Sequence, residues 1–190
     1  KIMKKIGIAD AFFNMNDLEF YGKLSFMKSG ILYSDAISTV SHRYAEEIMT
    51  PEYGCGLDGL LRARKDLLYG IPNGVDYSVW SPMNDPHIKA KYDSSSLDAK
   101  VECKKDLIER TRLEVSPDTP ILGVVSRLAK QKGVDLIAAA VGKFTSLGAA
   151  VVILGRGSQG VNRIFASLAE KFKGKVFVSN EFDDELAHKI

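Results

Sequence analysis

The second half of the chain predicts an α/β fold with a Rossmann-like parallel sheet. Short runs rich in β-branched residues are typical of buried strands, and the segments between them carry apolar residues at helical spacing. Strands that alternate with helices of this length form right-handed βαβ units, so the strands should be parallel. The expected strands are residues 121–125, 150–154 and 176–178, the expected helices between them are residues 134–144 and 159–172, and a last helix begins near Asp183 or Asp184.

The first half predicts part of another α/β domain. Residues 24–33 place apolar side chains on one face of a helix, residues 36–40 have the composition of a short strand, and residues 44–49 return to helical spacing. This succession is typical of a mixed fold rather than a helical bundle. The fold class is therefore α/β throughout, with a partial Rossmann-like sheet and the tail of a second α/β domain.

A connector separates the two halves. The stretch after residue 74 is rich in Asn, Asp and Ser, and Pro82 and Pro86 interrupt regular structure there. We expect Trp80 to pack this segment down. The predicted organisation is a first domain at residues 1–74, a connector at residues 75–96, and a second domain at residues 97–190 that opens with a polar helix at residues 97–114.

The composition excludes several classes of protein. Of 190 residues, 45% are hydrophobic and 26% are charged, as in an ordinary globular chain. A net charge of +2 is too small for a nucleic-acid reader, which needs a concentrated basic face. No apolar run approaches the ~18 residues needed to cross a membrane, and the first residues lack the apolar core of a signal peptide. We therefore expect a cytoplasmic protein with no nucleic-acid or membrane partner, and the oligomeric state is left open.

The cysteines and histidines predict neither a disulfide nor a metal site. Cys55 and Cys103 have no paired spacing, which suits two free thiols in a reducing compartment. His42, His87 and His188 are equally scattered, whereas a metal site needs them clustered with Cys or carboxylates. We therefore expect no metal.

A basic turn between the first strand and helix of the second domain predicts an anion site. Residues 126–133 read Ser-Arg-Leu-Ala-Lys-Gln-Lys-Gly, so Arg127 and Lys132 lie in one strand-to-helix turn. Open α/β sheets bind ligands at such turns, and a helix N-terminus favours negative charge. The alternative is that both side chains are ordinary solvated cations. Phosphate is the anion that we expect.

The pattern Ser-Arg-Leu-x-x-Gln-Lys-Gly-x-Asp-Leu at residues 126–136 resembles the nucleotide-sugar turn of bacterial glycogen synthases and plant starch synthases. Further stretches resemble the same family in the same order along the chain. They are residues 20–30, residues 39–41 with 44–48, residues 53–61, residues 73–76 with 80–82, and the tail at residues 182–190. The resemblance thus covers nearly the whole chain.

This resemblance implies a GT-B fold and a glucosyltransferase of glycogen or starch synthesis. The implied reaction moves glucose from ADP-glucose to the non-reducing end of an α-1,4-glucan with retention of configuration, without a cofactor. Arg127 and Lys132 would be its catalytic cations on the donor phosphate. Gly155 and Gly157 would approach the donor nucleotide, Phe182 would contact the adenine or serve as a core residue, and the resemblance places His188 near the nucleotide.

Two motifs of this family have no counterpart here, and two places depart from its pattern. The Lys-Thr-Gly-Gly loop and the later Glu-x-x-Gly segment are absent, so we expect a central piece of a longer enzyme that transfers no glucose by itself. The family usually has Pro after Thr-Val-Ser, where this chain has His42, and the loop at residues 155–160 is richer in Gly than usual. The first departure affects a helix start and the second the phosphate loop, and neither touches Arg127 or Lys132.

Two other functions remain open at this point. The spacing Gly155-x-Gly157-x-x-Gly160 after a strand, with Glu181 ending the next strand, is also typical of an NAD-dependent oxidoreductase. A non-catalytic carbohydrate-binding or regulatory module would instead need aromatic platforms. Trp80, the chain's one tryptophan, gives that reading little support.

Overall fold

Strand β6 (Ala150–Leu154) is the centre of the second half of the protein, because all five of its residues are buried. The computed structural model describes residues 2–190. It divides into two units, and the boundary along the chain falls between Val75 and Asp76. In the second unit β6 lies between β5 (Ile121–Val125) and β7 (Val176–Ser179), and both pairs are parallel. The predicted α/β class and parallel sheet are confirmed.

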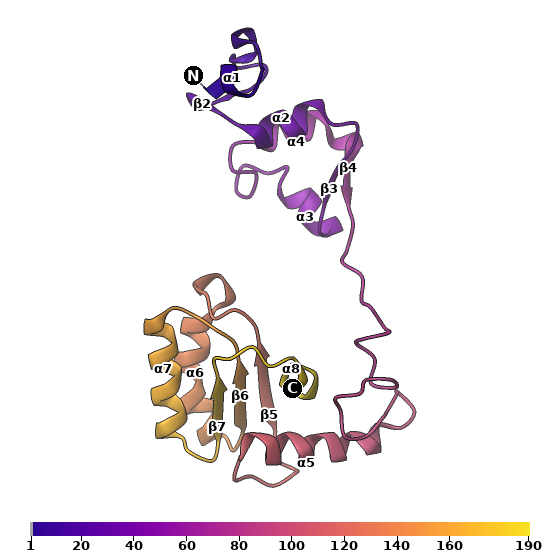
Figure 1. The fold of residues 1–190 in the computed structure, drawn as a ribbon, viewed down its shortest axis with the longest axis vertical. Coiled ribbons are helices and arrows are strands. Elements are labelled where there is room, and N and C mark those ends of the chain that lie inside the picture. The colour runs from indigo at the N-terminus through magenta and orange to yellow at the C-terminus, as the bar shows by residue number, and fades with distance from the viewer. Residues whose placement is uncertain (1) are drawn as a thin grey trace. The chain divides into compact units, whose positions relative to one another are not determined.

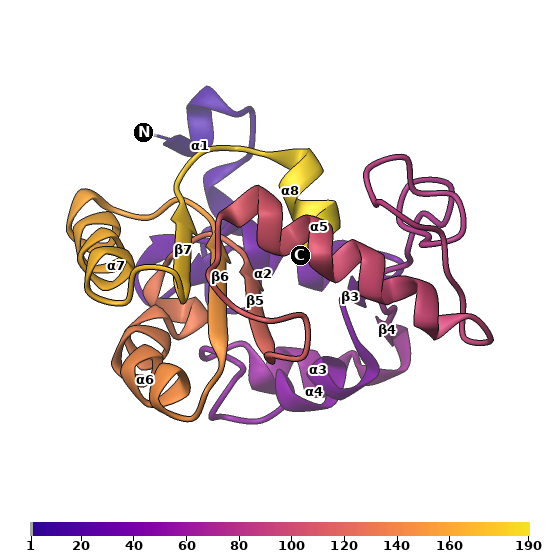
Figure 2. The same ribbon diagram turned by 90° about the horizontal axis from the view of Figure 1, so that it is seen from below.

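Helices cover this sheet on both faces, as Figures 1 and 2 show. Val151 and Ile153 of β6 pack with α6 (Val134–Ser146) and α7 (Gln159–Lys171). Ala150, Val152 and Leu154 face the other way, toward α5 (Lys100–Thr111) and α8 (Asp184–Lys189). The alternation has the period of two that a strand imposes on its side chains. A strand with apolar residues at every position needs this double cover.

Helix α5 ends at Thr111 rather than near residue 114, and a 3-10 turn, η3 (Leu97–Ala99), precedes it. The reason is Arg112, whose φ of 53° is left-handed and ends the helix. A glycine usually supplies that conformation, so the sequence carried no stop signal at this position. Leu113 then turns back into the core beside Leu107.

The first unit contains a short parallel pair, β3 (Ile37–Thr39) with β4 (Leu68–Gly70). Three helices accompany it, and a small antiparallel pair and further short helices complete the unit. The helices are α2 (Phe26–Tyr33), α3 (His42–Glu47) and α4 (Asp58–Ala63), and the other elements are α1 (Ile2–Lys5), η1 (Asp10–Phe12), β1 (Glu19–Phe20), β2 (Lys23–Leu24) and η2 (Lys65–Leu67).

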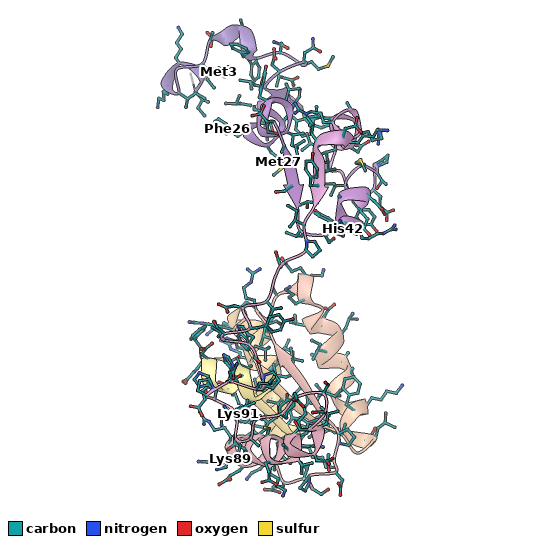
Figure 3. All side chains as sticks on the ribbon, turned by 90° about the vertical axis from the view of Figure 1, so that its right-hand side faces the viewer. Met3, Phe26, Met27, His42, Lys89 and Lys91 are labelled. Atoms are coloured by element: carbon teal, nitrogen blue, oxygen red, sulfur yellow. The ribbon has the colours of Figure 1, made fainter. Side chains whose placement is uncertain are left out.

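The start of α3 explains how His42 replaces the expected proline. Ser41 is the N-cap, and its hydroxyl accepts a hydrogen bond from the Tyr44 N–H at 2.9 Å. This cap supplies the helix start without proline. The backbone of His42, labelled in Figure 3, lies so close to Gly70 that a Cβ there would be 2.4 Å from its Cα. Position 70, the last of strand β4, therefore requires glycine. Because β4 has only three residues and one of them is glycine, its sequence did not indicate a strand.

The loops that follow β5 and β6 continue the sheet beyond its strands. The Ser126 N–H donates to the Leu154 carbonyl, and the Leu128 N–H donates to the Arg156 carbonyl at 2.9 Å. A Cβ on Gly155 would lie 1.8 Å from the Ser126 carbonyl oxygen. This close approach, rather than an unusual φ, requires glycine at position 155.

We predict that Gly155→Ala destabilises the second unit, whereas Gly160→Ala does not. The first change forces the two loops apart and should lower the free energy of unfolding by about 1–3 kcal/mol. A Cβ at Gly160 meets open space in the first turn of α7, so alanine there should be neutral or slightly stabilising. Urea unfolding followed by circular dichroism measures both variants. Equal stability of the two would contradict the steric explanation.

Candidate active site

A cavity of about 810 Å³ lies at the carboxyl ends of β5, β6 and β7. Its walls come from the three segments that follow these strands and from the start of α8. Parallel α/β sheets bind ligands at this edge. The residues that line it are Val125, Ser126, Arg127, Leu154, Gly155, Arg156, Asn162, Asn180, Glu181, Phe182, Asp183, Asp184 and Ala187.

Two arginines line this cavity. Arg127 follows β5 and Arg156 follows β6, so both leave the sheet at its carboxyl edge. Both are exposed, and neither forms an ion pair with a carboxylate anywhere in residues 2–190. Unpaired guanidinium groups bind phosphate oxygens through bidentate hydrogen bonds. Sequence reasoning identified Arg127 and missed Arg156, although the same rule of a cation after a buried strand applies to both.

Lys132 has a different position. It ends the 3-10 turn η4 (Lys130–Lys132), which precedes Gly133 and α6, and its side chain is exposed. It does not line the cavity. Lys132 therefore shares a strand-to-helix segment with Arg127, but the structure brings only Arg127 to the cavity wall.

Phe182 and Asn180 also line the cavity, one with an aromatic ring and the other with a side-chain amide. Phe182 is 96% exposed, so it is not a core residue. The Oδ1 atom of Asn180 is buried and has no hydrogen-bond partner within residues 2–190. An unsatisfied buried acceptor costs about 1–3 kcal/mol. A ligand in the cavity that offers a donor would satisfy it.

Of the carboxylates on the cavity wall, Asp183 already has hydrogen-bond partners within the protein. Asp183 accepts from Arg110 at 3.0 Å and also caps α8 by accepting from the Leu186 N–H at 2.8 Å. Glu181 is exposed. Asp183 therefore acts mainly as a structural group that fixes where α8 begins, directly after Phe182.

The glycine loop lacks the features that a dinucleotide requires. The Gly157 N–H donates to Asn162 Oδ1 at 2.9 Å, and the Gly155 N–H donates to the Ser179 carbonyl at 2.9 Å. Neither N–H is free for a pyrophosphate. The third glycine of that fingerprint serves close helix packing, yet a Cβ at Gly160 would meet nothing. Gly155 lines the cavity and Gly157 does not.

His188 lies away from the cavity wall and holds the connector instead. Its ring stacks on Trp80 with centroids 3.8 Å apart and planes 2° from parallel. Its Nδ1 lies 2.6 Å from Asp85 Oδ2, and its side chain is only 2% exposed. The expected packing of Trp80 is thus found, against α8. Because His188 covers one face of the indole, that face is closed to a sugar ring.

Asp85 is the buried acid of this cluster. Burial raises its pKa, but the hydrogen bonds from the His188 ring and from the His87 N–H outweigh that effect, so the pKa of Asp85 is lowered below 3.8. A carboxyl with a lowered folded pKa stabilises the protein above its unfolded pKa, and this stabilisation disappears as pH falls through the folded value.

We predict that Asp85→Asn lowers the free energy of unfolding of the second unit at neutral pH by about 1.5–3 kcal/mol, the range for hydrogen bonds to a charged group. The difference from the parent chain should shrink as the pH falls below the unfolded value of 3.8 and continue to zero below the folded pKa. Urea titrations at several pH values between about 3 and 7 measure this difference in the free energy of unfolding. A difference independent of pH would contradict an ionised Asp85.

Among the helices of residues 2–190, none is both long enough and apolar enough to cross a bilayer.

Cys55 is exposed and Cys103 is buried, and both are free thiols.

Residues 1–63 match a family model described as the starch synthase catalytic domain. The glycogen synthase of Francisella tularensis subsp. novicida is 41% identical over 190 residues, which is all of this chain and 39% of that protein. The glycogen synthase of Opitutus terrae is 40% identical over 189 residues, again 39% of its length. The chain therefore spans about two fifths of these relatives.

A solved structure agrees with the sequence relatives. It is the catalytic domain of starch synthase IV from Arabidopsis thaliana, bound to ADP and acarbose, with a TM-score of 0.87 and 29% identity. The match covers 98% of this chain and 40% of that one. In sequence along its whole length and in fold, the chain is similar to part of the glycogen and starch synthases, in agreement with its motifs.

Proposed function

We propose that this chain contributes to a glucosyltransferase that moves glucose from ADP-glucose to the non-reducing end of an α-1,4-glucan. Its relatives are glycogen synthases, and the similar starch synthase IV domain binds ADP and acarbose. Residues 97–190 would be the start of the nucleotide-sugar domain, residues 75–96 the connector, and residues 1–74 the end of the acceptor-side domain. The donor would be a substrate, with no cofactor needed.

The observation that supports this proposal best is the cavity at the carboxyl edge of the sheet, with Arg127 and Phe182 on its wall. A nucleoside diphosphate presents a flat base and two charged phosphates. An exposed aromatic ring suits the base, and an unpaired guanidinium suits the phosphates. The cavity volume of about 810 Å³ lies within the range of sites for small molecules.

Arg127 would act on the leaving group of the reaction. As the bond between the anomeric carbon and the diphosphate breaks, negative charge grows on the phosphate while the sugar becomes oxocarbenium-like. A fixed cation beside that phosphate stabilises the transition state more than the bound substrate. Lys132 would add a second charge from the start of α6, and Arg156 is a further candidate for phosphate binding.

Phe182 and Asn180 would recognise the nucleoside. Phe182 would stack on the adenine, and its almost complete exposure leaves a face of the ring available. The unpartnered Asn180 Oδ1 would accept a hydrogen bond from an amino or hydroxyl group of the nucleoside. Both residues follow β7, so one short segment would carry both contacts.

We predict that Arg127→Ala weakens ADP binding to the chain by about 10- to 150-fold, because a charge-assisted hydrogen bond contributes about 1.5–3 kcal/mol. Lys132→Ala should weaken it about tenfold, at the lower end of the same range. Lys130→Ala is the matched control, since this exposed lysine lies in the same turn as Lys132 but at a position that the pattern of residues 126–136 leaves free. Isothermal titration calorimetry measures all three.

In a longer enzyme that contains this chain, Arg127→Ala should also reduce turnover by about 10²- to 10³-fold, the scale for losing one preorganised donor. Unchanged ADP affinity and turnover in a folded Arg127→Ala protein would refute its role at the donor phosphate.

We predict that Phe182→Ala weakens ADP binding without changing stability. Stacking on a base is worth about 1–3 kcal/mol, or roughly 5- to 150-fold in affinity. Because Phe182 is 96% exposed, its removal opens no hole in the core. NADH serves as the competing ligand in the same titration, and we expect no saturable binding at millimolar concentration. Saturable NADH binding that Glu181→Ala weakens would favour the oxidoreductase instead.

A further inference from the structure

A cluster of nitrogen and oxygen donors lies between the connector and α8. His87 comes from the connector, and Asp184 and His188 come from α8. One ligand atom from each lies within 4.8 Å of the others. His188 Nε2 is 4.0 Å from Asp184 Oδ2, and the rings of the two histidines have centroids 4.8 Å apart. We propose that these three side chains bind a divalent transition-metal ion, with Zn²⁺ as the best match.

Asp85 contacts both histidines and prepares the His188 ring for this role. Its Oδ1 accepts from the His87 backbone N–H at 2.9 Å, and its Oδ2 lies 2.6 Å from His188 Nδ1. Since a carboxylate only accepts, Nδ1 of His188 carries the proton and the lone pair is on Nε2, the atom that faces Asp184. A carboxylate on the far nitrogen of a histidine is the usual outer contact of a zinc ligand.

Trp80 fixes the orientation of the His188 ring. The indole stacks parallel to the imidazole at 3.8 Å, and together with Asp85 it leaves the His188 side chain 2% exposed. Asp184, in contrast, is 62% exposed at its side chain. The cluster thus has one rigid, buried ligand and one accessible side through which an ion can enter.

The donor set selects the class of metal. Two imidazoles and one carboxylate suit Zn²⁺ and its neighbours better than Mg²⁺ or Ca²⁺, which prefer oxygen. Around tetrahedral Zn²⁺, ligand atoms lie about 3.3 Å apart, given bonds near 2.0–2.1 Å. The present separation between His188 Nε2 and Asp184 Oδ2 is 4.0 Å, and the ligand atoms of all three residues lie within 4.8 Å of one another, so the ligands must move closer to hold the ion. Asp184 is exposed and His87 is half-buried, so their side chains can make this movement, and water would complete the coordination.

A bound ion would join the connector to α8. His87 lies in the connector, whereas Asp184 lies two residues after Phe182 and lines the cavity itself. The ion would therefore stabilise the segment that carries the aromatic wall of the cavity. The scattered spacing of the histidines predicted no metal site, and this proposal departs from that prediction because the fold brings His87 and His188 together.

The test is a Zn²⁺ titration of the whole chain against a chromophoric chelator, repeated with Co²⁺ to record its visible spectrum. We expect one ion per chain and a Co²⁺ spectrum of low coordination number. His87→Ala and Asp184→Asn should each lower affinity at least about tenfold, and Asp85→Asn about 10- to 100-fold. His42→Ala and Glu185→Gln are matched controls, an exposed histidine of the first unit and the exposed acid beside Asp184, and both should bind like the parent chain.

Thermal unfolding gives a second readout. At the same concentration, Zn²⁺ should raise the unfolding temperature of the parent chain more than that of His87→Ala, because an ion that binds only the folded state stabilises it according to its affinity. Circular dichroism confirms that each variant is folded. If Asp85→Asn does not fold, His87→Ala and Asp184→Asn still decide the outcome. Absence of stoichiometric binding, or parent-like affinity in both of these variants, would overturn the proposal.

Discussion

The burial of β6 on both faces is the constraint on which the second unit depends. Each of the four larger side chains of this strand, Val151 to Leu154, gains about 1.5–3 kcal/mol from burial, so helices must cover both sides of the sheet. Two connections pass over one face as α6 and α7, while α5 and α8 close the other. Because the three strands are parallel, their carboxyl ends meet at one edge. The cavity lies at that edge for the same reason.

The close approach of two loops then arranges the cations. Ser126 and Leu128 pair with the loop after β6, so the ladder continues past the strands and Gly155 has no room for a side chain. This pairing holds the segments of Arg127 and Arg156 next to each other at the cavity wall. Two unpaired cations on one wall give that part of the cavity a positive charge, which suits an anionic ligand.

The connector is held to the second unit by the hydrogen bond between Asp85 and His188, and Trp80 stacks on the His188 ring. Asp85 accepts hydrogen bonds from the His188 ring and from the His87 backbone N–H. A buried carboxylate is tolerated only when it is paired and hydrogen-bonded. This requirement ties a segment rich in proline to the end of the chain, 103 positions away. Lys89 and Lys91 of the same segment stay exposed (Figure 3).

The sequence by itself determined the strands and helices of the second unit, since their periodicity and lengths are local properties. It also indicated Arg127, because a cation after a buried strand has a predictable position, and the motifs indicated the family. Tertiary structure alone decided which side chains meet. Lys132 lies outside the cavity wall, and His188 contacts Asp85 and Trp80, residues far from it in the chain. Such contacts follow from how helices pack on a sheet, and no local pattern encodes them.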